Sequence, residues 1–577
     1  MATTCLSFIR QQEYRSSMRR SCHTHTASAA APPPPGIIRS VSWRWQQHGR
    51  RRRRRHTCRL QCRQQLLVEQ NETDNRLTQN TGVFEPSIWG DFFLGYSNNP
   101  AASSSSQQQQ TKMEERAKAL KEEVAEIIAA STGLQERLHI IDTLERLCLD
   151  HLFEHEIDDA LRQIEAVDVS DYDLSTVALW FCLLRKHRYQ VSPGLYNAAH
   201  MRTHGETILD EAILFTRRHL ETMLPHLEGP LAREIKSSLE IPHPRRVRIY
   251  ESKYYISTYE KDDMVHEKVV QLAKVNSNIM QLHHQHELSI ITRLVECYLW
   301  ILGVYVEPCY SRGRIIMTMV IAILTMMDDI YDSYGSQEEC EFFTKCIESW
   351  DTKRAHDLPE CMKFALGKIL DSYETIANML HQEEKYRMQY LRYFTEYIAS
   401  AYNMEIKMRQ EGYIPKSIEE HLKVSLRTGA CPILSCTSFV GMHGIATKDC
   451  FDWVSSVPNM VQSLSIILRL ADDLESYERE KLNPHFASTI DSCMKEHNVS
   501  IEVAREKIQI LKEKSWKDFN SEWLNLDNAY PKQILEWIFN LTRTMEFMYS
   551  QGDNFTNCCN IKDTIHTLLV EPFMVIM

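Results

Sequence analysis

Apolar residues recur along most of the chain three or four positions apart, as they do on one face of an α-helix. A clear example of this spacing is Leu134, Leu138, Ile141, Leu144 and Cys148. Runs that alternate apolar and polar residues, as strands do, are few, and only 18 Gly and 19 Pro interrupt the 577 residues. The pattern predicts an all-α protein that is long enough for more than one domain.

Two of the apolar runs end in clusters of acidic residues. The first acidic cluster, Asp328 to Asp332, follows the run 315–327, and the second acidic cluster, Asp472 to Glu480, follows the run 466–471. Residues four apart in a helix project from one face about 5–6 Å apart. Each cluster is therefore expected to present a row of oxygen ligands at the polar end of a buried helix.

Oxygen ligands without histidine or thiolate favour Mg²⁺, which a few carboxylates hold while water and phosphate oxygens complete its shell. Without a cation, two carboxylates about 4 Å apart repel by about 4 kcal/mol at an effective dielectric of about 20, and their pKa values rise. A solvated acidic helix end is the simpler interpretation of either cluster alone. The pair, each next to an apolar helix, predicts a site for magnesium and a diphosphate.

The two clusters resemble the metal motifs of the plant class I terpene synthases, most of all those of the angiosperm sesquiterpene synthases. The DDxxD motif of that family matches Asp328, Asp329 and Asp332. Its second motif, [ND]DxxSxxxE, matches Asp472, Asp473, Ser476 and Glu480. Further similar stretches are residues 86–91, 204–206, 294–297, 412–415 and 568–572.

This resemblance implies two α-helical domains. Residues 71–249 would form an N-terminal α-barrel-like relict domain, which lacks the DxDD motif needed for protonation-initiated cyclisation. Residues 250–577 would form a C-terminal class I terpene synthase helical bundle that carries the metal site. The basic, proline-broken stretch from Pro242 to Arg246 is expected to link the two domains.

The family's activity implies a carbon–oxygen lyase of isoprenoid biosynthesis that acts on phosphates. It would ionise a prenyl diphosphate and cyclise or rearrange the carbocation. Three Mg²⁺ ions, for which Mn²⁺ can substitute, would be held by Asp328, Asp332, Asp472, Ser476 and Glu480. Bound metal stabilises negative charge on the departing diphosphate, so the C–O bond breaks without an external acid.

The resemblance also assigns roles around the metal ions. Catalytic roles are expected of Asp328, Asp329, Asp332 and Arg469, with Asp329 and Asp473 orienting ligands and water. Substrate contacts are expected of Arg293, Arg469, Trp300, Tyr549 and Asp553.

A desolvated carbocation is stabilised by aromatic faces, by about 2 kcal/mol or more. Candidates for such a lining are Tyr298, Trp300, Tyr331, Tyr549 and Phe555, although each is equally consistent with ordinary core. The stretch from Thr428 to Pro432 interrupts a helical pattern, because Pro removes a donor and Gly relaxes the backbone. It resembles the family's kinked helix, whose free carbonyls point at the cation, and an ordinary helix end is the alternative.

Departures from the family pattern bear on the substrate. The two arginines that monoterpene-forming members usually carry before Trp89 are replaced here by Gln79 and Asn80, so farnesyl diphosphate is the preferred substrate. The chain is also shorter than the family after Gly194 and around Arg293, where one arginine remains in place of two. The loss is expected to weaken diphosphate capture.

The first 68 residues contain fourteen Arg, no Lys and one acidic residue, Glu13. An Arg- and Ser-rich leader of this kind, residues 1–70, resembles a plastid transit peptide. A basic disordered tail is the alternative, which would leave the protein in the cytoplasm. A second biased stretch, from Asn98 to Gln110, is expected to be a flexible surface loop.

The remaining composition narrows the class of protein. A net charge of −11 argues against a nucleic-acid partner, and the longest apolar run, 315–327, is too short to span a bilayer. The 17 Cys form no CxxC pair, which argues against a zinc site. The prediction is a monomeric sesquiterpene synthase. The alternatives are a plastid monoterpene synthase using geranyl diphosphate, a folded but catalytically impaired relative, and a chain-elongating prenyltransferase.

Overall fold

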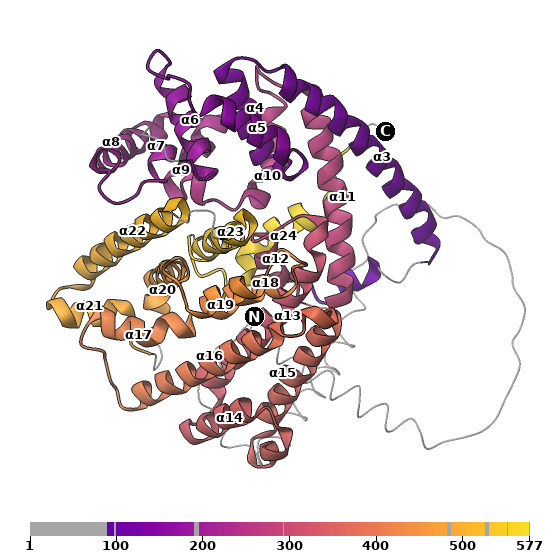
Figure 1. Ribbon diagram of the computed structural model, residues 1–577. Coiled ribbons are helices and arrows are strands. Elements are labelled where there is room, and N and C mark those ends of the chain that lie inside the picture. Colours follow the sequence, from indigo (N-terminus) through magenta and orange to yellow (C-terminus); the bar gives the residue numbers. More distant parts are fainter. Residues whose placement is uncertain are drawn as a thin grey trace, which may run out of the picture. The chain divides into compact units, whose positions relative to one another are not determined.

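A computed structural model describes residues 89–96, 100–189, 196–291, 294–481, 486–525, 530–550 and 552–575. Every regular element in these ranges is helical, which confirms the all-α prediction (Figure 1). The elements up to residue 245 are η1 (Phe92–Tyr96), α3 (Pro100–Ala130), α4 (Leu134–Arg146), η2 (Asp150–Leu152), α5 (Glu154–Ile164), α6 (Leu174–Lys186), α7 (Tyr196–Ala199), α8 (Thr207–Met223), η3 (Leu224–His226), α9 (Gly229–Glu240) and η4 (His243–Arg245).

The elements that follow residue 245 carry both acidic clusters. They are α10 (Arg248–Tyr259), α11 (Glu267–Ile291), α12 (Val295–Leu302), η5 (Pro308–Tyr310), α13 (Ser311–Asp329), η6 (Ile330–Tyr334), α14 (Gln337–Ser349), η7 (Thr352–Asp357), α15 (Glu360–Met379), η8 (Gln382–Glu384), α16 (Arg387–Gln410), α17 (Ile418–Thr428), α18 (Cys431–Val440), α19 (Lys448–Ser455), α20 (Asn459–Glu480), α21 (Thr489–His497), α22 (Ile501–Asn525), α23 (Lys532–Met548), η9 (Cys558–Ile561) and α24 (Lys562–Leu569).

One hydrophobic core joins the N-terminal helices to α10 and α11. The apolar face predicted for residues 134–148 is buried in it, together with Leu120 and Val124 of α3. Ile256 of α10 and Val269 of α11 belong to the same core, and α3 packs along α11 (Figure 1). The core therefore crosses residue 250, and the predicted domain boundary at that residue stays a prediction.

The prediction of a flexible loop from Asn98 to Gln110 is wrong for the described residues, because α3 already begins at Pro100. Pro is well suited to the first helical position, where its fixed φ matches the helix and its missing N–H removes no hydrogen bond. The four Gln that follow have good helix propensity. The segment therefore extends, in the N-terminal direction, the helix whose buried face includes Met113, Leu120 and Val124.

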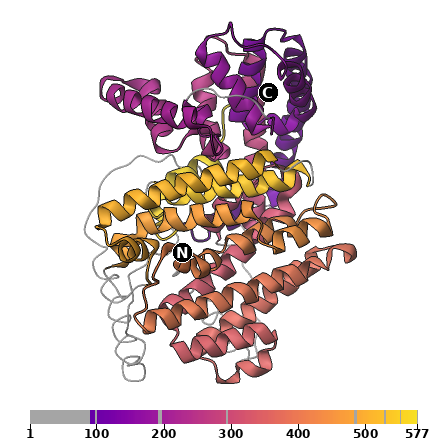
Figure 2. The same cartoon turned by 60° about the vertical axis from the view of Figure 1, so that its left-hand side comes forward.

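The helices that carry the acidic clusters surround α18. Helices α13, α16 and α20 each pack against it. Helix α13 crosses the end of α18 very closely, because a Cβ on Gly441 would lie 2.5 Å from the Cα of Gly313. Helix α20 is covered on another side by α22, and Figure 2 shows the length of these two helices.

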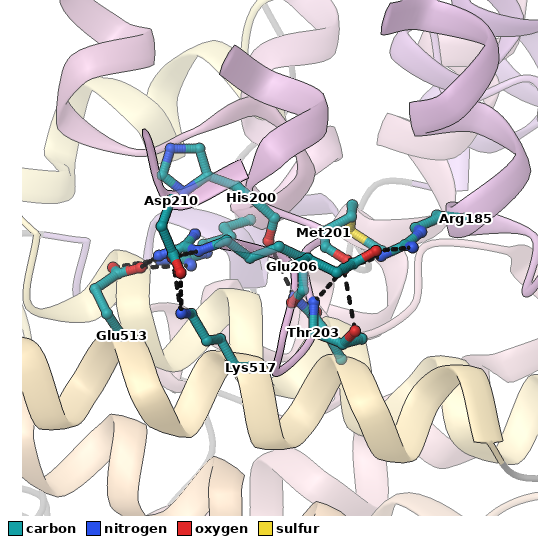
Figure 3. A network of polar contacts seen from close by, with 11 residues as sticks. Arg185, His200, Met201, Thr203, Glu206, Asp210, Glu513 and Lys517 are labelled. Atoms are coloured by element: carbon teal, nitrogen blue, oxygen red, sulfur yellow. Dashed lines mark hydrogen bonds and ion pairs between the residues drawn. The ribbon is translucent and has the colours of Figure 1, made fainter. Parts of the chain in front are cut away.

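A network of charged side chains joins the segment before α8 to α22 (Figure 3). Glu513 of α22 accepts hydrogen bonds from Arg245 at 2.8 Å and from Arg202 at 3.1 Å. Asp210 of α8 binds Arg202 at 2.7 Å and Lys517 of α22 at 2.8 Å. The stretch predicted to link two domains, which contains Arg245, is thus buried and fixed to α22.

No helix in the described ranges is both long enough and apolar enough to cross a membrane.

Candidate functional site

The first acidic cluster straddles the end of α13. Asp328 and Asp329 are its last two residues, and the chain continues into the π-helical turn η6, in which Gly335 N donates to Ile330 O at 2.8 Å. Asp332 lies in this wider turn, not in the α-helix that the spacing of the motif predicts. Such π-helical turns are common at functional sites.

The carboxylates of this cluster are close enough to disfavour one another's charge. Restricted hydration and the charges of Asp328 and Glu405 raise the pKa of Asp332 well above its ordinary value, although this side chain stays accessible to solvent. Burial and the charge of Asp328 raise the pKa of Asp329 to about 8. Its Oδ2 atom has no hydrogen-bond partner among the described residues.

The second acidic cluster lies at the C-terminal end of α20. Arg469 Nη1 donates to Asp472 Oδ2 at 3.1 Å and to Asp473 Oδ1 at 3.4 Å. Asp473 is buried, and its Oδ2 accepts a hydrogen bond from Thr489 N at 2.6 Å. Asp473 therefore connects α20 to the start of α21. The half-buried Asp472 is paired with Arg469.

The two acidic clusters lie close enough together for their charges to interact. Burial raises the pKa of Asp328 to about 6, the nearby charge of Arg469 lowers it, and the charges of Glu480 and Asp553 raise it. Asp332 also experiences the charge of Glu480. Glu480 belongs to α20 and Asp328 to α13, so oxygen ligands from both helices lie near each other.

Asp472, Ser476 and Glu480 complete the second cluster. Burial raises the pKa of Asp472 well above its ordinary value, and the charges of Glu480 and Asp473 raise it further against the effect of Arg469. Burial and the charge of Asp473 raise the pKa of Glu480, against a smaller lowering by the nearby Ser476 hydroxyl. This buried hydroxyl makes no hydrogen bond of ordinary geometry among the described residues. The hydroxyl oxygen is thus free to bind a cation.

Glu405 of α16 is a further carboxylate beside the two acidic clusters, and the sequence analysis did not identify it. Burial and the charge of Asp328 raise its pKa to about 7, while Arg469 and a hydrogen bond from Thr428 lower it. The Thr428 Oγ1 to Glu405 Oε1 distance is 2.8 Å. Several charged residues lie along α16 without forming a recognisable motif, so nothing in the local sequence marks Glu405.

Asp553 and Tyr549, predicted to contact substrate, lie beside the second cluster. The charges of Asp472 and Asp553 act on Tyr549, whose pKa burial raises well above its ordinary value. Asp553 is buried and accepts a hydrogen bond from Arg479 Nη2 of α20 at 2.8 Å. A carboxylate repels a diphosphate directly, so Arg479 is the group that Asp553 can orient toward one.

The aromatic candidates fall in different surroundings. Trp300 is fully buried in α12, and its Nε1 has no hydrogen-bond partner in the described part of the chain. The Tyr298 hydroxyl donates to Glu287 at 2.7 Å, beside Arg314, within the core between α11 and α13. Tyr331 packs on Tyr402 with ring centroids 5.3 Å apart. Phe555 is half-buried.

The predicted helix interruption near Pro432 is present. Helix α17 ends at Thr428 and α18 begins at Cys431, with Ala430 in the left-handed region at a φ of 61°. Arg293, the shortened stretches at Gly194 and Arg293, the leader, and Gln79 and Asn80 all lie outside the described residues.

The donor set fits magnesium. Its members are carboxylate and hydroxyl oxygens, several of which are held without a countercharge. No group of three or more His, Cys, Asp or Glu side chains in the described ranges is by itself placed to hold a metal ion. The candidate ligands are divided between α13, η6 and α20, and Mg²⁺ usually takes its remaining ligands from water and phosphate oxygens.

Comparison with known families supports this assignment. Residues 280–518 match the model described as "Terpene synthase family, metal binding domain". Residues 88–194 and 194–239 match "Terpene synthase, N-terminal domain". The second match is in two pieces that meet at residue 194, where the sequence predicts a shortened stretch.

Individual relatives and structures agree with the family models. The chain is 51% identical to the chloroplastic alpha-terpineol synthase of Zea mays, over 86% of each chain. It is 38% identical to the alpha-humulene synthase of Zingiber zerumbet, over 85% of this chain and 96% of the relative.

Two solved structures share the fold. Limonene synthase with 2-fluorolinalyl diphosphate aligns with a TM-score of 0.78 and 27% identity, over 85% of this chain and 99% of that one. Isoprene synthase from grey poplar, Populus x canescens, in complex with three Mg²⁺ ions and dimethylallyl-S-thiolodiphosphate aligns with a TM-score of 0.74 and 25% identity, over 81% and 98%. Given these matches along both of its helical parts, the chain belongs to the terpene synthase family.

Proposed function

We propose that this terpene synthase ionises farnesyl diphosphate with Mg²⁺ and cyclises or rearranges the carbocation to a sesquiterpene, releasing diphosphate. The observation that carries the proposal is the proximity of the two acidic clusters: burial raises the pKa of Asp328 at the end of α13, and the charge of Glu480 of α20 acts in the same direction. The 38% identical relative is an alpha-humulene synthase, which supports a sesquiterpene product.

The metal ligands in this proposal come from both helices. Asp328 and Asp332 hold Mg²⁺ from one side, and Asp472, Ser476 and Glu480 hold it from the other. Glu405 of α16 is an added candidate ligand beside Asp328. When bound, Mg²⁺ neutralises charge that develops on the leaving diphosphate.

Arg469 binds the diphosphate in this proposal. Its Nη1 is occupied by Asp472 and Asp473, which fix the plane of the guanidinium. Its Nε has no hydrogen-bond partner in the described part of the chain. A planar fork with free donors suits phosphate oxygens, so Arg469 can receive the diphosphate as the electron pair of the C–O bond leaves with it.

The allylic cation that remains is held away from water. Tyr549 lies beside the second acidic cluster and Trp300 stays a candidate from the sequence; aromatic faces stabilise positive charge by about 2 kcal/mol or more when desolvated. Every residue of α18 is buried, and in this proposal the apolar side chains around this helix exclude solvent from the reacting carbon chain. The pocket's contour then decides which skeleton forms.

The direct test is incubation of the full-length chain with Mg²⁺ and either farnesyl or geranyl diphosphate, followed by analysis of volatile products. The proposal predicts sesquiterpenes from farnesyl diphosphate with the higher kcat/KM. Terpene products from geranyl diphosphate alone would contradict the substrate preference, and products longer than the supplied substrate would indicate a prenyltransferase.

A second candidate is a plastid monoterpene synthase that uses geranyl diphosphate. The observation that favours it is the 51% identity to a chloroplastic alpha-terpineol synthase, to which the Arg-rich leader adds support. Import of a fluorescent protein carrying residues 1–70 into plastids would test the address separately from the chemistry.

An impaired enzyme is the remaining alternative, because the sequence is shorter than the family around Gly194 and Arg293. Measuring diphosphate release with and without Mg²⁺ separates it from the active candidates. We also propose that the protein is a monomer, which sedimentation of the purified chain would test.

A further inference from the structure

Arg409, near the C-terminal end of α16, contacts the first acidic cluster and a residue that follows the second. Its Nη1 donates to the carbonyl oxygen of Asp332 at 2.7 Å, and its Nη2 donates to that of Tyr331 at 3.5 Å. The guanidinium also lies over the ring of Phe486, 4.5 Å from its centroid. Arg409 and Phe486 belong to neither metal motif identified in the sequence, whereas Asp332 is the last aspartate of the first one.

The two carbonyls belong to the π-helical turn η6. The last carbonyls of a helix lack intrahelical donors, and a cation there is favoured by the helix dipole. Here the chain leaves η6 at Gly335, whose N–H is already bound to Ile330 O. Arg409 therefore supplies donors to the backbone of Asp332 itself and of its neighbour, which fixes the turn that carries this proposed metal ligand.

Phe486 brings Arg409 into contact with the segment that follows the second acidic cluster. Helix α20 and its second acidic cluster end at Glu480, and Phe486 lies a few residues further along the chain, before α21 begins. Helix α16 itself packs between α14 and α18. One guanidinium thus contacts the backbone of the first acidic cluster and the segment that follows the second.

We infer that Arg409 is a positioning residue that holds Asp332 at the spacing from α20 that Mg²⁺ requires. The inference rests on the proposed function of the same site. Arg409 acts through the carbonyls of Tyr331 and Asp332, not by touching the diphosphate. Without it the η6 turn would fluctuate, and misplacement of a reacting or binding group by about 1 Å can cost about a hundredfold in rate.

The test is the Mg²⁺ concentration that gives half of the thermal stabilisation in the presence of inorganic diphosphate, measured on the full chain. For Arg409→Met we expect this concentration to rise about tenfold, while the melting temperature without metal stays near that of the wild type. Arg409→Lys, which can donate to one carbonyl, should restore part of the effect. Turnover should follow the same order.

Arg392 offers a matched control on the same helix. Its Nη2 donates to the carbonyl oxygen of Glu348 at 3.3 Å, and its guanidinium lies over the ring of Trp350, 5.0 Å from its centroid. It therefore has a carbonyl contact and a ring contact like those of Arg409, but its partners Glu348 and Trp350 belong to neither acidic cluster. Arg392→Met should leave the half-saturating Mg²⁺ concentration within about twofold.

Equal half-saturation in Arg409→Met and Arg392→Met would overturn the inference. If Arg409→Met does not fold, Phe486→Leu decides, because it removes the ring contact alone. A rise of about threefold is expected from that variant, and no rise would contradict us. A wild-type chain that neither binds Mg²⁺ with diphosphate nor turns over substrate would overturn the proposed function itself, and the inference with it.

Discussion

Individual carboxylates of the acidic clusters, and Glu405 beside them, lower the stability of the metal-free protein when they are charged. Asp328, Asp329 and Glu405 have pKa values raised to about 6, 8 and 7, in each case by burial first and by neighbouring carboxylates second. Such groups lose hydration on folding and gain no fixed cation in return, apart from Arg469. Their arrangement is explained by the metal ions that we propose they bind.

Asp328→Asn should reduce kcat/KM by at least about a hundredfold, because a neutral amide cannot balance the charge of Mg²⁺. The same change removes repulsion between carboxylates in the metal-free site, so the melting temperature of the metal-free protein should stay unchanged or rise. Asp371→Asn, at an exposed position of α15, is the control. A variant with full activity would remove Asp328 from the ligand set.

The metal-free protein should lose stability as the pH rises from about 4 to 8. The folded-state pKa values of Asp328, Glu405 and Asp329 lie above their unfolded values, so the folded state binds more protons in this range and the free energy of unfolding falls. The loss is on the order of 2 kcal/mol after allowance for partial exposure. Chemical denaturation at several pH values measures it.

Saturating Mg²⁺ with inorganic diphosphate should remove most of this pH dependence, because a bound cation favours the charged carboxylates. Stability that is flat with pH in the metal-free protein would mean that these groups are better solvated than the structure indicates.

At the scale of helices, the apolar spacing was a good guide and local composition was a poor one. The faces of α4, α13 and α20 follow from the positions of their apolar residues, because burial of one helix face has a fixed period. The loop predicted near Gln110 is helix, since low complexity says little about backbone conformation. Glu405 and Arg409 were missed because tertiary packing, and no local motif, brings them near the acidic clusters, whereas Arg479 lies within the second cluster and was given no role.

Helix α22 links the N-terminal segment to the helix that carries the second acidic cluster. Glu513 on α22 neutralises Arg202 and Arg245, which are both buried. These charges lower the pKa of Glu513, although burial alone would raise it. Its stabilising effect is therefore present above the ordinary glutamate pKa and is lost as the pH falls below it.

Glu513→Gln should lower the free energy of unfolding by about 3 kcal/mol, because it removes the countercharge that two buried guanidinium groups share, although Arg202 keeps its bond to Asp210. Denaturant unfolding at neutral pH measures the change. The control is Glu506→Gln, at an exposed position of the same helix, for which we expect a change within about 0.5 kcal/mol. Equal effects in the two variants would show that the network contributes little.

At the scale of the whole molecule, the sequence predicted the fold class and the two acidic clusters, and the structure added how they meet. The residues of each cluster are close in sequence, so helix geometry relates them. The distance between the clusters is set by α16, α18 and α22, and no sequence spacing encodes it. The shortened stretches at Gly194 and Arg293 lie outside the described residues, and their effect on capture of the diphosphate stays a prediction.

The central claim is that the two clusters bind one metal–diphosphate group together. A double-mutant cycle tests it most directly: calorimetry of Mg²⁺ binding, with inorganic diphosphate, to the wild type, Asp328→Asn, Asp472→Asn and the double variant. We predict that each single change removes most of the binding and that the double variant loses little more, as expected for residues that act as a unit. Losses that simply add would contradict a shared site.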